Sequence, residues 1–252
     1  MKKIIEVKNL VKNYGTFQAV KGISFDVMEG EIFGLLGPNG AGKSTTLEII
    51  ETLRTKTSGQ VTVDGFNLDT NPNDIKKLIG VQLQASGYYP GLNLTELIHL
   101  FNGLYNRDVK PMELLDLVNL RDKAKAKYKE LSGGQKQRFS VATTLINNPK
   151  IIFLDEPTTG LDPQARRSLW DLIRNIRDKG TTVIITTHYM DEAEVLCDRI
   201  AVIDSGVIIS LDTPDKMIDD LVSTGFERPK TVKAATLEDV FIHLTGKSLR
   251  ED

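Results

Sequence analysis

The sequence predicts an α/β fold with a mainly parallel sheet, an N-terminal antiparallel β part and an inserted α-helical part. Short apolar runs, typical of buried parallel strands, alternate with amphipathic helical segments. A glycine-rich loop joins one of these runs to a helix, and residues 86–148 are mostly helical in pattern. The 252 residues are enough for one large α/β domain with a subdomain.

Composition favours a packed protein. Hydrophobic residues make up 40% of the chain and charged residues 26%, so disorder is not expected. The formal net charge of -2 gives no reason to expect a nucleic-acid partner. The single cysteine, Cys197, excludes an intrachain disulfide, and its apolar neighbours predict a buried packing residue.

No segment has the pattern of a secretory signal or a membrane span. The start is basic at Lys2 and Lys3, but Glu6 interrupts the apolar region that a signal peptide needs. No apolar run approaches the ~20 residues that cross a bilayer. We therefore expect a cytoplasmic chain that reaches a membrane only through a partner.

The N-terminal part begins with strand patterns. Residues 4–11 and 18–36 are strand-like, with a turn at Glu29-Gly30. The apolar run 32–36 enters the glycine-rich loop, and a helix is predicted over 44–53. A short alternating strand follows at 61–63, before a turn of Asp64 and Gly65.

The middle of the chain is predicted to be helical. Apolar positions between 94 and 105 mark one helix face, with Asn93 as its N-cap and Glu96 three residues later. Helical patterns also cover 114–118 and 139–146. These segments predict a helical subdomain.

Strand patterns return in the last part. They cover 151–155, 181–187 and 199–203, and a helix around 169–176 is stopped by Gly180. This β-α-β alternation predicts parallel pairing with right-handed crossovers.

The domain organisation follows from these patterns. We predict an α/β core of residues 1–84 and 149–211, with the helical subdomain at 85–148. A C-terminal helical appendage is expected at 212–252, with helices that start at Thr213-Pro214 and at Thr236.

The glycine-rich loop matches the phosphate-binding pattern G-x-x-x-x-G-K-[ST], and its place between a strand and a helix predicts a P-loop NTPase core. Glycines let backbone N–H groups point at phosphate oxygens, and the helix N-terminus adds a positive dipole. The cationic and hydroxyl side chains that close the loop suit the β- and γ-phosphates and Mg²⁺, respectively. The predicted nucleotide-binding residues here are Gly37, Pro38, Asn39, Gly40, Ala41, Gly42, Lys43, Ser44 and Thr45.

A second motif ends the apolar run at 151–154. Asp155 and Glu156 are expected at the carboxyl edge of the sheet, where α/β proteins bind ligands. Asp155 would hold Mg²⁺ directly or through water, and Glu156 would orient or deprotonate the attacking water. The alternative is a strand that merely ends in acidic loop residues, which the phosphate-binding loop upstream disfavours.

Three further side chains stand at positions that suit nucleotide chemistry. Gln84 follows a strand-like run and suits contact with Mg²⁺ and the attacking water, with Gln82 or a plain surface role as alternatives. His188 ends another strand-like run, where it could donate a hydrogen bond to the γ-phosphate. Tyr14 precedes a glycine turn and suits either stacking on adenine or a place in the core.

A second anion-binding element is predicted at Leu131-Ser132-Gly133-Gly134-Gln135, which we call the signature. At a helix N-terminus, the Ser132 hydroxyl and the N–H groups of Gly133 and Gly134 would face an anion. The phosphate-binding loop of the same chain already surrounds one face of a nucleotide.

Together and in this order, the motifs resemble the ATP-binding cassette (ABC) ATPases, the nucleotide-binding subunits of ABC transporters. The resemblance covers nearly the whole chain, from the Walker A loop at 37–44 to the H-loop histidine, His188. It implies an adenine-stacking role for Tyr14 and favours Gln84 over Gln82. The other matching motifs are the Q-loop at Gln84, the signature at 131–135, Walker B at 151–156 and the D-loop Gly160-Leu161-Asp162.

The resemblance also implies a composite site. Two ATP molecules would be held between two head-to-tail chains, and the signature of one chain would cover the γ-phosphate bound by the other. Asp162 would help to couple the two sites. Because Ser132, Glu156 and His188 are all present, the implied pair is a homodimer, with a related ATPase subunit as the alternative.

The C-terminal side is similar to the ABC-2 exporter subgroup, which includes daunorubicin-resistance and sodium-extrusion ATPases. The similar segments are 188–194, 197–200 and 236–246. The similarity implies an ABC-2 type membrane permease as partner, contacted around 85–92, and a peripheral location at the inner face of the cell membrane.

Two other classes of protein are considered. A soluble ABC ATPase acting in translation or DNA repair is disfavoured, because the chain has one cassette and no sustained heptads. A P-loop kinase or a regulatory nucleotide-binding module is disfavoured by the signature, Glu156 and His188.

Overall fold

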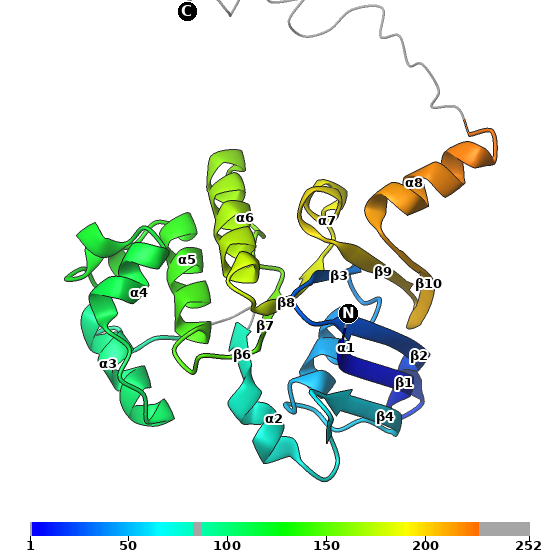
Figure 1. Ribbon diagram of the computed structural model, residues 1–252, viewed down its shortest axis with the longest axis horizontal. Helices are drawn as coiled ribbons and strands as arrows, with labels where there is room; N and C mark the ends of the chain where they lie inside the picture. Colours follow the sequence, from blue (N-terminus) through cyan, green and yellow to red (C-terminus); the bar gives the residue numbers. More distant parts are fainter. Residues whose placement is uncertain (1, 83–86, 227–252) are drawn as a thin grey trace, which may run out of the picture. The chain divides into compact units, whose positions relative to one another are not determined.

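The computed structural model describes residues 2–82 and 87–226 (Figure 1). The chain divides into two compact units, Met1–Met217 and Ile218–Asp252. The first unit holds both sheets, and the last described helix, α8 (Pro214–Ser223), crosses the boundary between the units. The helix predicted at Thr236 and the segment 236–246 lie outside the described residues.

The central sheet has six strands, five of them parallel. Near-continuous apolar runs form its middle strands, as expected where helices or a second sheet cover both faces. The edge strand β10 pairs antiparallel with β9. In spatial order the strands are β10 (Val207–Asp212), β9 (Arg199–Asp204), β3 (Ile32–Leu36), β8 (Thr182–Thr187), β7 (Ile151–Asp155) and β6 (Ile79–Gln82).

The second sheet is antiparallel and N-terminal, as predicted. Asp64 and Gly65 both have positive φ, of 47° and 83°, in the two-residue turn between its last two strands. Such a turn matches the twist of the strands that it joins. In spatial order the strands are β2 (Phe17–Met28), β1 (Lys3–Tyr14), β4 (Ser58–Val63) and β5 (Phe66–Asn67).

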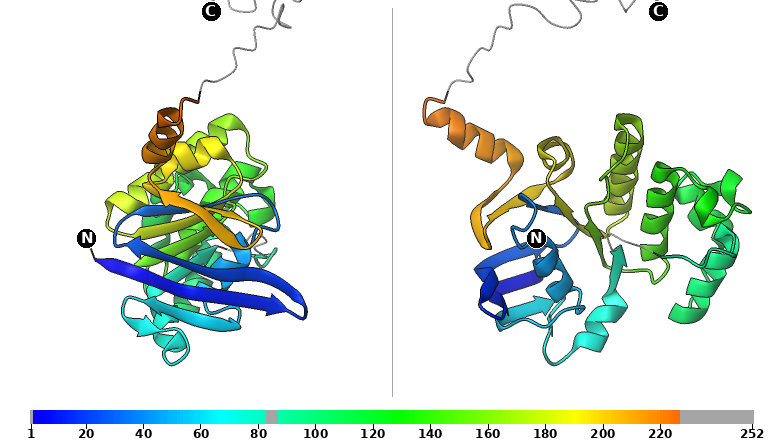
Figure 2. Two further views of the ribbon diagram at one scale, coloured as in Figure 1. Left: turned by 90° about the vertical axis from the view of Figure 1, so that its right-hand side faces the viewer. Right: turned by 180° about the vertical axis from the view of Figure 1, so that it is seen from behind.

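The inserted helices lie on the side of the central sheet away from β1, β2 and β4 (Figures 1 and 2). The predicted N-cap of the first helix is confirmed, because the Asn93 side chain accepts from Glu96 N at 3.0 Å and the Glu96 carboxylate accepts from Asn93 N at 2.8 Å. These helices are α3 (Leu94–Tyr105), α4 (Pro111–Leu117) and α5 (Gly133–Thr144), with short 3₁₀ turns at Arg121–Lys123 and Tyr128–Glu130.

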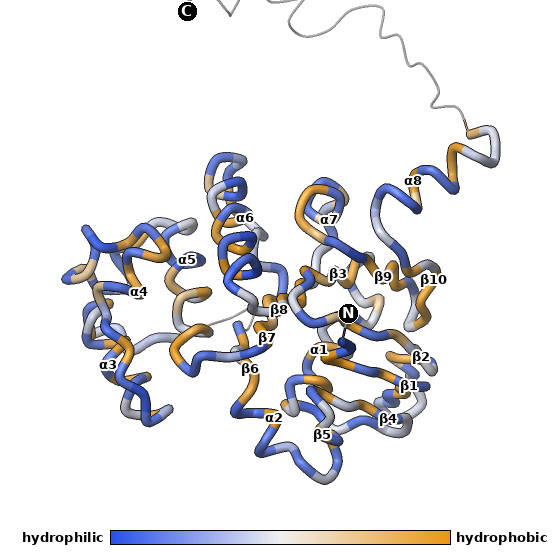
Figure 3. Tube along the Cα trace, viewed as in Figure 1, coloured by the Kyte–Doolittle hydropathy of each residue, from blue (hydrophilic) through white to orange (hydrophobic). Residues whose placement is uncertain are grey.

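Two hydrophobic cores lie on opposite faces of the central sheet. Ile32 and Leu36 of β3 join the core that includes α3 to α7, while Phe33 and Leu35 join the core of α1 and the antiparallel sheet. This alternation follows from the period of two along a strand. The apolar runs of β3, β7 and β8 appear in Figure 3. The remaining helices are α1 (Lys43–Ile50), α2 (Pro72–Leu78), α6 (Pro163–Asp178) and α7 (Met190–Leu196).

The α/β fold with a mainly parallel sheet is therefore confirmed, and Cys197 is buried as predicted. The strands β5 and β10 and the helices α2 and α7 were not predicted as elements. Within 2–82 and 87–226, every helix is too short or too polar to cross a membrane. The residue boundaries assigned to the core, the helical subdomain and the appendage stay a prediction.

Candidate functional site

The phosphate-binding loop connects β3 to α1, as predicted. Gly40 and Gly42 have φ of 80° and 102°, in the left-handed region that glycine adopts without strain. A Cβ on Gly42 would lie 2.7 Å from the carbonyl oxygen of Ala19 in β2. Glycine at this position therefore lets the loop curl directly against the N-terminal sheet.

Lys43 is buried at the centre of the loop. Its Nζ donates to the carbonyl oxygens of Gly37 and Pro38, at 2.8 and 3.0 Å. Burial lowers the pKa of Lys43, while the nearby carboxylates of Glu156 and Asp155 act in the opposite direction. The loop thus surrounds a desolvated ammonium group, which suits a polyanion.

The hydroxyl of Ser44 and the carboxylate at the end of β7 meet, as the two motifs predicted. Ser44 Oγ donates to Asp155 Oδ1 at 3.1 Å. Thr186 of β8 also donates to this carboxylate. Hydroxyl and carboxylate oxygens are the ligands that Mg²⁺ prefers, so this pair fits the ion.

Glu156 has side-chain partners that differ from those of Asp155. Its backbone is left-handed, with φ of 46°, and its N–H donates to Thr186 Oγ1 at 3.0 Å. Its Oε1 lies 3.7 Å from Lys43 Nζ and 3.3 Å from His188 Nδ1. The pair with His188 lacks the alignment of a hydrogen bond, since Nδ1 has no hydrogen-bond partner among the described residues. The turn thus separates two adjacent carboxylates, one beside Ser44 and one beside Lys43 and His188.

Tyr14 lines the same cavity as the loop. It is 39% exposed, so it is not a core residue, and its role toward adenine stays a prediction. The cavity has a volume of about 390 Å³. It is lined by Tyr14, Phe17, Ala19, Asn39, Gly40, Gly42, Lys43, Ser44, Thr45 and Glu156.

The glutamine alternatives are only partly visible. Gln84 lies outside the described residues, and so do residues 85 and 86 of the expected permease contact. Gln82 is buried at the end of β6, and its Oε1 has no hydrogen-bond partner among the described residues. The preference for Gln84 stays a prediction.

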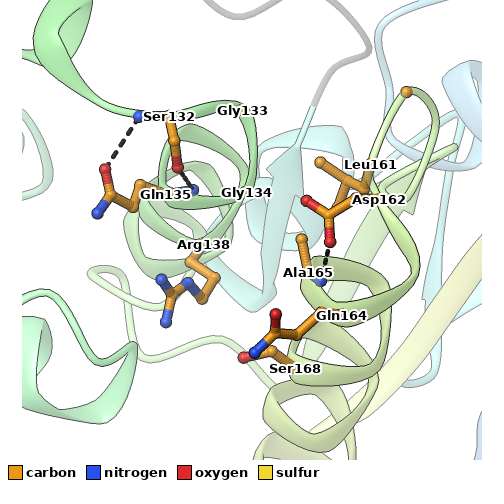
Figure 4. Close-up of a pocket in the computed structure, with 11 residues that line it drawn as sticks. Ser132, Gly133, Gly134, Gln135, Arg138, Leu161, Asp162, Gln164, Ala165 and Ser168 are labelled. Atoms are coloured by element: carbon orange, nitrogen blue, oxygen red, sulfur yellow. Dashed lines mark hydrogen bonds between the residues drawn. The ribbon is translucent and has the colours of Figure 1, made fainter. Parts of the chain in front are cut away.

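The signature forms the N-terminus of α5, as predicted. The Ser132 hydroxyl accepts from Gln135 N at 3.3 Å, and Gln135 Oε1 accepts from Ser132 N at 2.9 Å. Across a gap, Asp162 caps α6 by accepting from Ala165 N at 2.8 Å (Figure 4). A Cβ on Gly134 would lie 3.0 Å from Ala165 Cβ, so glycine permits this close approach of α5 and α6.

Residues Ser132–Gln135 of the signature and the D-loop line a second, open cavity of about 470 Å³. None of its lining residues belongs to the phosphate-binding loop. In one copy of the chain, the two elements predicted to bind anions therefore line two separate cavities. The lining residues are Ser132, Gly133, Gly134, Gln135, Arg138, Gly160, Leu161, Asp162, Gln164, Ala165 and Ser168.

Sequence reasoning missed several of these positions. Thr186 forms hydrogen bonds with both Asp155 and Glu156, and Phe17 lines the cavity of the phosphate-binding loop. Threonine is common in strands, and Phe17 follows the glycine turn without belonging to a motif. Nothing in the sequence therefore identified Thr186 or Phe17 as a site residue. Arg138 also lines the cavity beside the signature, and only its position three residues after the signature could have indicated this.

Comparison with known proteins decides the family. Residues 20–159 match the family described as ABC transporter. The linearmycin resistance ATP-binding protein LnrL of Bacillus subtilis (strain 168) is 40% identical over 83% of this chain and 69% of its own length. The chain belongs to the ABC transporter ATP-binding family.

Two further comparisons agree with membership of the ABC family. The Nod factor export ATP-binding protein I of Burkholderia orbicola (strain AU 1054) is 40% identical over 85% of this chain and 72% of its own length. Among solved structures, the ATP-binding cassette MJ0796, described as a dimeric post-hydrolysis state bound to ADP and Pi, has a TM-score of 0.74. It is 30% identical and covers 83% of this chain and 98% of its own.

As an ABC ATPase, the chain binds and hydrolyses ATP as the subunit that powers a membrane transporter. This assignment replaces the alternative of a soluble ATPase in translation or DNA repair.

Proposed function

We propose that two copies of this chain power an exporter of the ABC-2 type by closing around two ATP molecules. Support for export comes from relatives whose names refer to export and to antibiotic resistance. The observation that carries the dimer is the separation, within one chain, of the cavity at Lys43 from the cavity at Ser132.

Each half-site is incomplete alone. The phosphate-binding loop surrounds the phosphates with backbone N–H groups and Lys43, but it leaves the outer side of the γ-phosphate open. The signature of a second copy supplies a hydroxyl, N–H groups and a helix dipole for that side. A two-fold axis then makes two identical sites, and Asp162, beside the signature, links them.

The side chains have separate roles in hydrolysis. Lys43 neutralises charge on the β- and γ-phosphates, and Tyr14 stacks on the adenine. Ser44, Asp155 and Gln84 would hold Mg²⁺, which supplies further charge neutralisation on the phosphates.

Glu156 acts on the attacking water. As the water oxygen bonds to the γ-phosphorus, its proton passes to the Glu156 carboxylate. The bond from phosphorus to the bridging oxygen breaks, which leaves ADP and phosphate. His188, 3.3 Å from Glu156, donates a hydrogen bond to the γ-phosphate and senses its loss. Loss of that group then weakens the closed dimer.

The remaining partner is a permease. We propose that an ABC-2 type membrane subunit docks around residues 85–92 and holds the chain at the inner face of the cell membrane. Co-purification of the tagged chain with its membrane neighbour tests this partner. A chain that purifies from membranes without any integral membrane subunit contradicts it.

The composite site is tested with three variants. Glu156→Gln is expected to bind ATP, to lose turnover by about 10² to 10⁴-fold and to accumulate as an ATP-dependent dimer in size-exclusion chromatography. Adding Ser132→Arg should abolish that dimer while each chain still binds ATP. Lys43→Ala should abolish binding itself, as measured by calorimetry.

The exposed Lys129, just outside the signature, offers a control, since Lys129→Ala in the Glu156→Gln background should still dimerise. The proposal fails if Ser132→Arg weakens ATP binding of the monomer as strongly as Lys43→Ala. That result would place both motifs on one nucleotide within a single chain.

A further inference from the structure

Two cations approach the ring of Tyr14. Lys12 Nζ lies 5.0 Å from the ring centroid, and the guanidinium carbon of Arg54 lies 5.4 Å from it. Both distances fall within the ~6 Å range of a cation–π interaction. Neither Lys12 nor Arg54 lines the cavity that Tyr14 shares with the phosphate-binding loop. Both cations therefore contact the ring without belonging to the residues that line this cavity.

Both cations are fixed by other groups. Arg54 Nε donates to Glu48 Oε2 at 2.5 Å, and Arg54 N donates to the carbonyl oxygen of Glu48 at 3.0 Å. Lys12 Nζ donates to the carbonyl oxygen of Thr55 at 2.6 Å. Glu48 belongs to α1, whose first residue is Lys43. One helix thus carries the phosphate-binding lysine at its start and, near its end, the anchor of a cation on Tyr14.

Fixing the ring helps to bind a base for two reasons. An exposed tyrosine loses side-chain freedom when a base stacks on it, and a ring that is already held loses less. The face of an aromatic ring is electron-rich, and a nearby cation draws that density away, which reduces repulsion toward a stacked base. Tyr14, at 39% exposure, is the kind of side chain that needs such support.

We propose that Arg54, assisted by Lys12, is a positioning residue for the nucleobase. It holds the Tyr14 ring at a set distance from the phosphate-binding loop, through Glu48 and α1. The proposal rests on the adenine-stacking role of Tyr14 in the proposed function. The positioning role affects the affinity for ligands that contain a base. It does not affect the affinity for a phosphate chain without a base.

The test compares two ligands. Arg54→Ala is expected to weaken the binding of magnesium ATP by about two- to five-fold, as the loss of one exposed cation–π contact implies. Binding of magnesium tripolyphosphate, which has no base, should be unchanged. Arg54→Lys should keep most of the affinity for ATP, because it retains a cation. Calorimetry on the full chain measures all three.

A matched control is Arg121→Ala. Arg121 is also exposed and also pairs with a carboxylate, that of Asp116, but among the described residues no ring contact involves it. This control should leave both affinities unchanged. In a Tyr14→Ala background, Arg54→Ala should have no further effect on ATP binding.

The outcomes separate the two proposals. If Tyr14→Ala weakens ATP binding but Arg54→Ala does not, the positioning role is wrong and the stacking role stands. Equal loss for ATP and tripolyphosphate also overturns the positioning role, because it shows general damage to α1. If Tyr14→Ala leaves ATP binding unchanged, the stacking role itself fails.

Discussion

Glu51 is a buried acid that the proposed mechanism does not use. It caps the C-terminal end of α1, is 3% exposed, and its Oε1 has no hydrogen-bond partner among the described residues. Burial, followed by the charges of Asp155 and Glu48, raises the pKa of Glu51 to about 8. The folded protein therefore holds a proton on Glu51 that the unfolded chain releases near its ordinary value of 4.5.

This difference predicts a pH-dependent stability. Proton binding by Glu51 contributes to the free energy of unfolding, because the native state binds the proton more tightly than the unfolded chain. This contribution is complete below about pH 4.5 and is lost as the pH rises to about 8. Glu51→Gln mimics the protonated form. At pH 9 the variant should exceed the wild type by a few kcal/mol in free energy of unfolding, and this excess should shrink toward pH 5.

Urea unfolding of the nucleotide-free protein in EDTA at pH 5, 7 and 9 measures the effect. Glu113→Gln, at an exposed acid of α4, serves as the control and should follow the wild-type profile. Parallel profiles for Glu51→Gln and the wild type would contradict the assigned pKa.

At the scale of single residues, the sequence predicts those whose position is set by the segments next to them in the chain. Lys43, Ser44 and Asp155 were identified because a strand, a loop or a helix adjacent in sequence fixes their position. Glu51 and Thr186 were not, since each interacts with Asp155, which is far away in the sequence. The role of Arg54 likewise depends on its contact with Tyr14 at the end of β1, which the local sequence around Arg54 does not indicate.

At the scale of elements, a row of polar contacts joins α6 to α7 and the segment that flanks it. Its α6 side chains stand at positions 166, 170, 174 and 177, which share one helix face. Asp162 of the D-loop caps the N-terminus of α6, and α7 starts two residues after His188, so the row ties the helix after the D-loop to the helix after the H-loop. The contacts are Arg166 to Asp191 (3.1 Å), Trp170 to Glu192 (3.0 Å), Arg174 to the carbonyl of Val195 (2.8 Å) and Arg177 to Asp198 (3.3 Å).

The central contact of this row predicts a stability effect. Trp170 Nε1 donates to Glu192 Oε1, while Glu192 is fully buried and its Oε2 has no partner among the described residues. Trp170→Phe keeps an aromatic ring but removes the donor, so the carboxylate stays buried without a partner. The expected loss is about 1–3 kcal/mol in free energy of unfolding.

Trp170 is the only tryptophan of the chain, so the variant has no tryptophan fluorescence. Far-UV circular dichroism during urea unfolding therefore measures the loss. The double variant Trp170→Phe/Glu192→Leu should recover part of the stability, because an apolar pair leaves no unpaired group. If the double variant is as unstable as the sum of both single variants, the hydrogen bond is not the cause.

Elements with an apolar run or a clear periodic pattern were predictable, and several short elements without such a pattern were not. The strands β3 and β7 consist mostly of apolar runs, β8 has an apolar centre of Val183, Ile184 and Ile185, and α3 carries a capping box. In contrast, α2 and α7 have seven residues each and β10 is largely exposed, so their patterns are too short or too mixed. Their conformation is set by packing against neighbours, which a local pattern does not contain.

At the scale of the whole first unit, the two sheets meet at the phosphate-binding loop. Lys21 N of β2 donates to Gly206 O at 2.8 Å, and Gly206 N donates to Ala41 O of the loop at 3.0 Å. A Cβ on Gly206 would lie 2.7 Å from the carbonyl oxygen of Ala19. The turn between β9 and β10 therefore supports the loop from the side of the central sheet, while β2 supports it from the antiparallel sheet.

This junction predicts that Gly206→Ala affects both stability and ATP binding. The φ of Gly206 is 82°, so alanine there carries backbone strain of about 1 kcal/mol, and the clash with Ala19 adds about 1–3 kcal/mol. Gly180 has a φ of 95°, and no atom of the described residues lies within 4 Å of the position that a Cβ would take there. Alanine at Gly180 therefore isolates the backbone strain from any clash.

Gly180→Ala should lose only about 1 kcal/mol and keep its affinity for ATP, while Gly206→Ala should lose more stability and bind ATP more weakly. The reason is that relief of the clash must move either β2 or the turn, and the turn holds Ala41 in the loop. Thermal unfolding and calorimetry with ATP measure the two effects. Equal losses of stability in the two variants, with equal affinities, would mean that the sheets can separate at this point without disturbing the loop.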